Sequence, residues 1–232
     1  MGERDQKETE ARAELDWKED LIPVSTRFDD PYFSLAGGLE ETRYVFLAGN
    51  DLPARFTPGF QIAELGFGTG LNLLATLIAW RTAGIAAPLR FISFEAFPMQ
   101  AEEMAGALRA FPEAEAVAGP VLDQWADGAR RITLSDLDLQ VVIGDARETL
   151  PGWEGRADAW YLDGFSPAKN PELWSESLMA EVAAHTAPSG SFATYAAAGF
   201  VRRGLQAAGF QTERVTGYAG KRHMSRGMLD IR

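Results

Sequence analysis

The chain has 232 residues, of which 46% are hydrophobic, and a formal net charge of −11 at pH 7. This length and composition can bury a large core, and we expect one domain with an N-terminal extension. The chain has no cysteine and two histidines, which excludes disulfides, sulfur-rich zinc sites and the thiol that covalent pyrimidine C5-methylation requires; we expect no metal.

The N-terminal part is assigned to the extension. Residues 1–20 carry eight acids and four bases, which is typical of a partly helical or frayed surface segment. We expect residues 1–55 to pack on the core as this extension, and residues 56–232 to form the single domain. The longest apolar stretch, residues 71–80, is half of what a bilayer needs, and no secretory pattern opens the chain. We therefore expect a soluble cytoplasmic protein without membrane contact.

Hydrophobic periodicity predicts strands and helices in alternation, which is typical of a doubly wound α/β sheet. We expect five strands near residues 60–64, 89–94, 138–143, 158–162 and 190–195. We expect helices near residues 71–82, 98–110, 172–186 and 199–208. A final antiparallel pair near residues 210–216 and 225–231 brings the predicted sheet to seven strands. For residues 111–138 the sequence pattern assigns neither helix nor strand.

Three glycines lie between the first of these strands and the helix that follows it. They are Gly66, Gly68 and Gly70, and Leu71 stands where a dinucleotide fingerprint would place its third glycine. A pyrophosphate site is therefore disfavoured. The carboxylate of Glu64 would repel phosphates, whereas it suits a sulfonium cation. The pattern E-x-G-x-G-x-G resembles the first motif of the class I methyltransferases, which implies a Rossmann-like fold and S-adenosyl-L-methionine as cofactor.

Further acids follow the later strands. Glu95 comes at the distance where α/β nucleotide sites place a carboxylate on the ribose, and Asp145 could accept a hydrogen bond from the adenine amine. Each acid alone is more often a helix cap or a solvated charge, but their position at successive strand ends favours a site. The cofactor residues that we predict are Glu64, Gly66, Phe67, Gly68, Gly70, Asn72, Glu95, Asp145 and Asp163.

A second block, residues 163–171, reads D-G-F-S-P-A-K-N-P and is followed by Trp174. It closely resembles the D-G-F-x-P-x-K-N-P-x-x-W signature of the MnmC methyltransferase-domain / MnmD-like family. Residues 28–34, 38–46, 198–205 and 220–222 add to the resemblance, which therefore spans roughly residues 21–228.

The resemblance implies a class I methyltransferase domain that methylates 5-aminomethyl-(2-thio)uridine at the wobble position of the tRNA anticodon loop. The bifunctional members of the family also carry a flavin-dependent domain, whose G-x-G-x-x-G unit is not present in this chain. The implied partners are therefore tRNA and an upstream uridine-modifying or flavin-dependent enzyme that supplies the aminomethyl group.

The implied chemistry needs alignment and a free amine lone pair rather than a nucleophilic side chain. Asp163 is the predicted catalytic residue, and orientation of the amine is favoured over a role as the base. Phe165, Tyr32 and Phe33 could sandwich the uracil, although Tyr32 and Phe33 could instead pin the N-terminal segment to the core. Lys169 could contact a phosphate or cap its loop, which Pro167 and Pro171 stiffen; both Pro167 and Lys169 are predicted substrate residues.

The C-terminal part has the opposite charge bias to the whole chain. Residues 201–232 carry seven bases and two acids, and Lys221 and Arg222 are predicted substrate residues there. Such a surface could dock a polyanion, or it could simply solubilise the protein. A methyltransferase that acts on a small-molecule amine remains the alternative function, and a non-catalytic cofactor-binding protein is disfavoured because both sequence blocks are retained.

Overall fold

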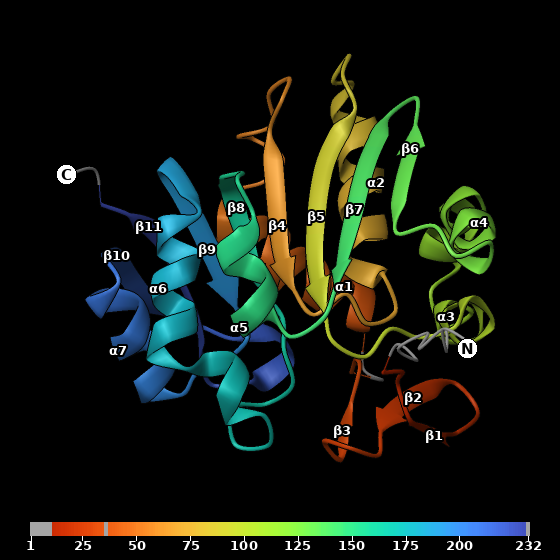
Figure 1. Cartoon of the computed structure of the whole chain (residues 1–232), viewed down its shortest axis with the longest axis horizontal. Coiled ribbons are helices and arrows are strands. Elements are labelled where there is room, and N and C mark those ends of the chain that lie inside the picture. The colour runs from red at the N-terminus through yellow and green to blue at the C-terminus, as the bar shows by residue number, and fades with distance from the viewer. Residues whose placement is uncertain (1–10, 35–36, 231–232) are drawn as a thin grey trace, which may run out of the picture.

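The computed structural model describes residues 11–34 and 37–230 and shows a twisted central sheet with helices on both faces (Figure 1). The prediction for residues 1–20 lies partly outside these ranges; within them, residues 15–18 form a strand. The helices are α1 (Gly38–Thr42), α2 (Leu71–Ala83), α3 (Ala101–Leu108), α4 (Pro112–Ala126), α5 (Ala146–Thr149), α6 (Glu176–Ala184) and α7 (Gly199–Ala207). Shorter helical turns cover Arg43–Leu47, Ala48–Asn50, Leu150–Gly152, Pro171–Trp174 and Tyr218–Gly220.

The central sheet has, within the described residues, the strand order β10-β11-β9-β8-β4-β5-β7-β6. Its strands are β4 (Gln61–Leu65), β5 (Leu89–Glu95), β6 (Arg131–Leu134), β7 (Leu137–Ile143), β8 (Ala157–Leu162), β9 (Thr186–Thr194), β10 (Phe210–Val215) and β11 (Met224–Leu229). The strands β7, β5, β4, β8 and β9 are parallel neighbours, and β10 and β11 form the predicted antiparallel pair. The doubly wound α/β fold is thus confirmed.

The sheet has one strand more than the seven predicted. The additional strand, β6, pairs antiparallel with β7 at the edge of the sheet. In β6 only Ile132 is fully buried, so four residues with a single core side chain give no readable alternation. Helix α4 also lies in the stretch that the sequence left unassigned, and its apolar periodicity is interrupted by Gly119 and Pro120.

Alternate residues of each strand face opposite helical layers. Ile62, Phe91 and Tyr161 belong to the apolar cluster that includes α2 and α4. Their neighbours Ala63, Ile92 and Trp160 belong to the cluster that includes α5, α6 and α7. Figure 1 shows α5 and α6 on the near side of the sheet and α2 on the far side. The period-two alternation of a strand buried on both faces explains this division.

The parallel strands all end at the same edge of the sheet, which positions the site. A small antiparallel sheet, formed by β1 (Leu15–Lys18), β2 (Ile22–Ser25) and β3 (Asp30–Pro31), lies beyond this edge (Figure 1). Ligands of open α/β sheets bind at the carboxyl ends of the strands. No helix within the described ranges is long and apolar enough to cross a membrane.

Candidate active site

A cavity of about 620 Å³ opens at the carboxyl ends of β4, β5, β7 and β8. Backbone hydrogen bonds continue the sheet into the turns that line it: Gly66 donates to Phe94 (2.9 Å), Gly144 to Glu95 (2.9 Å) and Asp163 to Leu65 (3.1 Å). The acids that the sequence places at successive strand ends are therefore held in one row. Of the predicted site residues, Gly66, Phe67, Gly68, Asn72, Glu95, Asp145, Asp163, Tyr32, Phe33, Phe165 and Lys221 line the cavity.

In the glycine turn after β4, two of the three glycines lie so close to neighbouring residues that a side chain would clash with them. Gly66 has φ of +90°, and a Cβ on it would lie 2.3 Å from the carbonyl oxygen of Asp163. Gly68 has φ of +52°, and a Cβ there would lie 3.1 Å from the ring of Tyr32. Gly70 differs, because it faces Phe67 and Met104 in the core rather than the cavity. Its left-handed conformation instead begins α2.

Glu95 connects two neighbouring turns. Its carboxylate accepts hydrogen bonds from the backbone N–H of Gly68 (2.9 Å) and of Phe97 (2.8 Å). Each carboxylate oxygen has a second lone pair, so these bonds leave acceptor capacity for ligand hydroxyls.

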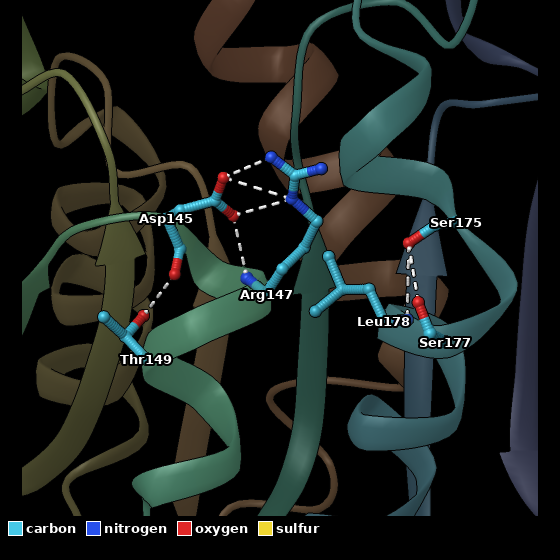
Figure 2. A network of polar contacts seen from close by, with 6 residues as sticks. All are labelled: Asp145, Arg147, Thr149, Ser175, Ser177 and Leu178. Carbon is cyan, nitrogen blue, oxygen red and sulfur yellow. Dashed lines mark hydrogen bonds and ion pairs between the residues drawn. The ribbon is translucent and has the colours of Figure 1, made fainter.

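The carboxylate of Asp145, predicted to be available to the adenine, already accepts hydrogen bonds from Arg147. Figure 2 shows its carboxylate beside the guanidinium of Arg147, with the shortest contact at 2.5 Å. Asp145 also caps α5 by accepting from the backbone N–H of Arg147 (2.9 Å), and these bonds lower the pKa of Asp145. Sequence reasoning missed Arg147, which lines the cavity and competes with a ligand for this carboxylate. In the same view, Ser175 caps the neighbouring helix α6 (Figure 2).

Glu64 lies beneath the cavity instead of in its wall. The side chain is fully buried and accepts hydrogen bonds from Asn72 Nδ2 (2.9 Å) and Ser93 Oγ (2.7 Å). Burial raises the pKa of Glu64 well above its usual range. Since Ala63 and Leu65 face the other layer, the alternation of β4 turns Glu64 toward α2. Its predicted direct contact with the cofactor is not supported by this position.

Asn72 of α2 joins this buried acid to the cavity. Its Nδ2 donates to Glu64 and to Asp163 Oδ2 (2.6 Å), and its Oδ1 accepts from Thr42 Oγ1 (2.9 Å). All of its hydrogen-bonding atoms are therefore used within the protein, which orients Asp163 from below.

Asp163 follows β8 and is partly buried in the cavity wall. Burial raises the pKa of Asp163 to about 7, opposed by the hydrogen bond from Asn72. Glu41 raises this pKa further, and Lys221 lowers it. A carboxylate with this pKa exchanges its proton near neutral pH, as an acid-base or orienting group can.

Aromatic rings form the opposite wall. The ring of Phe165 stacks on Phe28 with centroids 4.7 Å apart, and Tyr32 meets it edge-on at 5.0 Å. Phe33 instead packs on Phe111 at 4.8 Å, although it also borders the cavity. Sequence reasoning missed Phe28, whose signal was its position four residues before Tyr32 in the same aromatic segment. We call Phe28, Tyr32 and Phe165 the aromatic wall.

The signature loop after Asp163 is held by bonds to its carbonyls. Trp174 Nε1 donates to Phe165 O (2.9 Å), and Tyr195 Oη donates to Gly164 O (2.5 Å). Lys169 contacts Asp29 and Asp30 of the N-terminal sheet, with an Nζ to Asp30 Oδ1 distance of 3.6 Å. Neither Lys169 nor Pro167 lines the cavity. In this structure Lys169 therefore pins the loop to the extension.

The two predicted basic residues of the C-terminal part are separated. Lys221 lines the cavity and forms an ion pair with Glu41, whereas Arg222 is exposed outside it. Desolvation lowers the pKa of His223, and the charges of Arg214, Arg222 and Arg202 lower it further, which indicates that these three arginines lie near this histidine. Among the described residues, none of these three arginines forms an ion pair. We call them the arginine cluster.

Comparison with known proteins identifies methyltransferases and MnmC proteins as relatives. The model of a family described as S-adenosyl-L-methionine-dependent methyltransferase matches residues 112–230. The bifunctional protein MnmC of tRNA 5-methylaminomethyl-2-thiouridine biosynthesis from Aeromonas hydrophila is 47% identical, over 93% of this chain and 35% of the relative. Its counterpart from Stutzerimonas stutzeri is 46% identical, over 94% of this chain and 34% of the relative. The chain thus spans about a third of the length of these relatives.

Solved structures show the same fold. The crystal structure of MNMC2 from Aquifex aeolicus has a TM-score of 0.75 and 25% identity, and the match covers 97% of this chain and 73% of that one. TrmN from Thermus thermophilus shares the fold alone, with a TM-score of 0.50 and 19% identity over 88% of this chain and 54% of that one. The resemblance found in the sequence is confirmed, and the chain belongs to the S-adenosyl-L-methionine-dependent methyltransferase family.

Proposed function

We propose that the chain methylates the amino group of 5-aminomethyl-(2-thio)uridine at the wobble position of tRNA, which gives 5-methylaminomethyl-(2-thio)uridine. The observation that carries this proposal is the position of Asp163, between the glycine turn and the aromatic wall of one cavity. The similarity to MnmC proteins supports it, since their name specifies tRNA 5-methylaminomethyl-2-thiouridine biosynthesis.

The cavity fits S-adenosyl-L-methionine as the methyl donor. A side chain at Gly66 would clash with the carbonyl of Asp163, and one at Gly68 would press on Tyr32, so both glycines let the turn lie close to the segments that line the cavity. We propose that these glycines and Phe67 border the cofactor, that Glu95 holds the ribose hydroxyls and that Asp145 meets the adenine edge. Asn72 and Glu64 would act indirectly, by holding Asp163 from below. The bound cofactor supplies an electrophilic methyl group on a sulfonium.

The protein must deliver the substrate amine in its neutral form. With a lysine-like pKa of about 10.4, roughly 0.04% of the amine is neutral at pH 7, a cost of nearly 5 kcal/mol. The aromatic wall would desolvate the amine and lower its pKa. We propose that Asp163 mainly orients the amine through a hydrogen bond, and that its pKa of about 7 also lets it accept the released proton.

Base recognition would use the aromatic wall. Splayed-out bases are commonly held by stacking on aromatic side chains. We propose that the uracil lies against Phe165 and Tyr32, with Phe33 at the border of the site. The ring of Phe28 stacks on Phe165 and supports it from one face.

The arginine cluster is the proposed contact with tRNA phosphates. Arg222 directly follows the cavity residue Lys221 in the chain and is exposed, and we propose that an RNA strand whose base enters the cavity passes beside the cluster. We further propose that an upstream uridine-modifying or flavin-dependent enzyme supplies the aminomethyl uridine and that the chain acts in the cytoplasm. We also propose, from the sequence pattern, that residues 1–55 form an extension and residues 56–232 form the methyltransferase domain.

A transfer assay with a radiolabelled methyl donor tests the substrate class. We expect label in tRNA from cells that lack the methylation step, and none in fully modified tRNA. Label in small alkylamines at comparable efficiency, with none in tRNA, would replace the proposal by a small-molecule N-methyltransferase.

A further inference from the structure

An ion pair between two elements far apart in sequence lies in the wall of the cavity. Glu41 of α1 and Lys221, between β10 and β11, are in direct contact, and both line the cavity with Asp163. The Glu41 side chain is only 13% exposed. Lys221 Nζ also lies 5.6 Å from the ring centre of Tyr195, whose hydroxyl holds the carbonyl of Gly164 next to Asp163. The pair is thus built into the reaction site.

The other cations of the cavity wall are engaged elsewhere. Arg147 binds Asp145, and Arg27 lies over the ring of Phe97 at 4.4 Å. Lys221 and Glu41 are the charged partners with the clearest effect on the pKa of Asp163. Their charges act in opposite directions, which makes their roles separable.

The remaining groups around Asp163 are neutral or acidic. Asn72 of α2 donates a hydrogen bond, the buried Glu64 of β4 lies behind Asn72, and Tyr195 follows β9. Asp30 of β3 also lines the cavity. Lys169 compensates Asp30 (Nζ to Oδ1 3.6 Å), whereas removal of Lys221 would leave Glu41 and Asp163 without a compensating charge among the described residues that line the cavity.

We propose that Glu41 and Lys221 form a positioning pair that sets the ionisation of Asp163, with Lys221 keeping the carboxylate ionised to receive the substrate amine. The assay for this role rests on the proposed function, because it follows methyl transfer to tRNA. In this account Lys221 acts inside the site and not as a phosphate contact. Glu41 holds the ammonium in place and limits its pull on Asp163.

The charge arrangement predicts opposite effects for two substitutions that each remove one charge. Lys221→Gln removes the cation and leaves Glu41 unpaired, so the acid limb of the pH profile of kcat/KM should move to higher pH. Glu41→Gln frees Lys221 to act on Asp163 alone, so that limb should move to lower pH. Each shift should be about half a pH unit, as expected for a unit charge several Å away in a partly hydrated site. The Glu41→Gln/Lys221→Gln double variant should return close to the wild-type profile.

The experiment measures methylation of hypomodified tRNA from pH 5.5 to 9 for the wild type and these three variants. Arg131→Gln is the control for loss of one positive charge, because Arg131 is on the edge strand β6, away from the cavity. Its profile should match that of the wild type. Loosening of the site would lower kcat in both single variants without moving their limbs apart. Unchanged limbs, or shifts in one common direction, would overturn the proposal.

The outcomes also separate this inference from the proposed function. Wild-type protein that fails to methylate tRNA refutes the function itself. Active wild type with unshifted variants refutes only the role of the pair. A lower salt dependence of tRNA affinity in Lys221→Gln would return Lys221 to the phosphate contacts and would contradict its placement here.

Discussion

At the scale of single residues, Asp163 joins the chemistry to the scaffold. It is held from below by Asn72, which is itself fixed by Glu64 and Thr42. The sequence predicted that Asp163, Asn72 and Glu64 all contact the ligand; in the structure Asp163 and Asn72 line the cavity, whereas Glu64 lies buried beneath it. The reason is that a one-dimensional pattern places a side chain at a strand end, whereas the alternation of β4 decides which layer it enters.

Replacement of Asp163 should separate catalysis from cofactor binding. Asp163→Ala should lower kcat by about a hundredfold, because both orientation and proton acceptance are lost. The affinity for S-adenosyl-L-methionine, measured by calorimetry, should stay within a few-fold. Asp163→Asn should retain more activity than Ala if orientation dominates. An equal loss of cofactor affinity would instead reassign Asp163 to the cofactor.

Asp163 should also destabilise the folded protein at neutral pH. Its pKa rises from 3.8 to about 7 on folding, so the folded state is disfavoured once this carboxyl must ionise. This destabilisation is absent below about pH 4, grows as the pH rises and is complete above about pH 7. Asparagine does not titrate. Asp163→Asn should therefore raise the Tm by about 2–4 °C at pH 8 and by less at pH 5. A constant difference across this range would contradict the pKa shift.

At the scale of elements, the glycine turn combines a special backbone with a close neighbour. Gly68→Val should abolish cofactor binding in calorimetry, because the added atoms meet Tyr32 at the cavity. Gly59→Val is the matched control: Gly59 also has a positive φ, but nothing lies within 4 Å of its Cβ position. Both variants should lose stability through backbone strain. If both lose cofactor binding equally, strain and not occupancy is the cause.

Elements with strong local patterns were predictable, and those that depend on tertiary contacts were not. Helix α2 and strand β5 were found to within a residue or so, since long apolar runs define them. Strand β6 has a single fully buried residue and exists because β7 offers an edge for pairing. The N-terminal sheet was missed for a similar reason, since β3 has two residues and is defined only by its pairing with β2.

At the scale of the whole molecule, the net charge of −11 opposes association with RNA. Attraction must then come from residues close to the phosphates, since fields fade over a Debye length of about 8 Å. The local excess of basic residues could be predicted from the sequence. Which of them belong to the cavity could not be predicted, because Lys221 and Arg222 are adjacent in the chain and yet face the cavity and the solvent, respectively.

Salt dependence of tRNA binding tests the arginine cluster. The Arg214→Gln/Arg222→Gln double variant should lower the slope of log affinity against log salt by about one to two, because counterion release is lost. Arg226→Gln is the control from the same hairpin, as Arg226 is already paired with Glu213 and Asp51. Cofactor affinity should not change in either variant. An unchanged slope in the double variant would move the tRNA to another face.

The aromatic wall could not be predicted from either of its two sequence segments alone. Phe28 and Tyr32 contact Phe165, which lies more than a hundred residues later in the chain. The small N-terminal sheet lies beyond the carboxyl ends of the parallel strands (Figure 1). The sequence showed each aromatic segment separately and the family resemblance. The contact between the two segments depends on the tertiary structure.

The most direct test of the central claim is nucleoside mass spectrometry of hypomodified tRNA after incubation with the protein and a cofactor that carries an isotope-labelled methyl group. The account predicts that 5-aminomethyl-(2-thio)uridine is consumed and that the labelled methyl appears on its exocyclic nitrogen, with little transfer by Asp163→Ala. Label on a ring carbon, a ribose oxygen or another nucleoside, or none in tRNA while small amines are methylated, would contradict it.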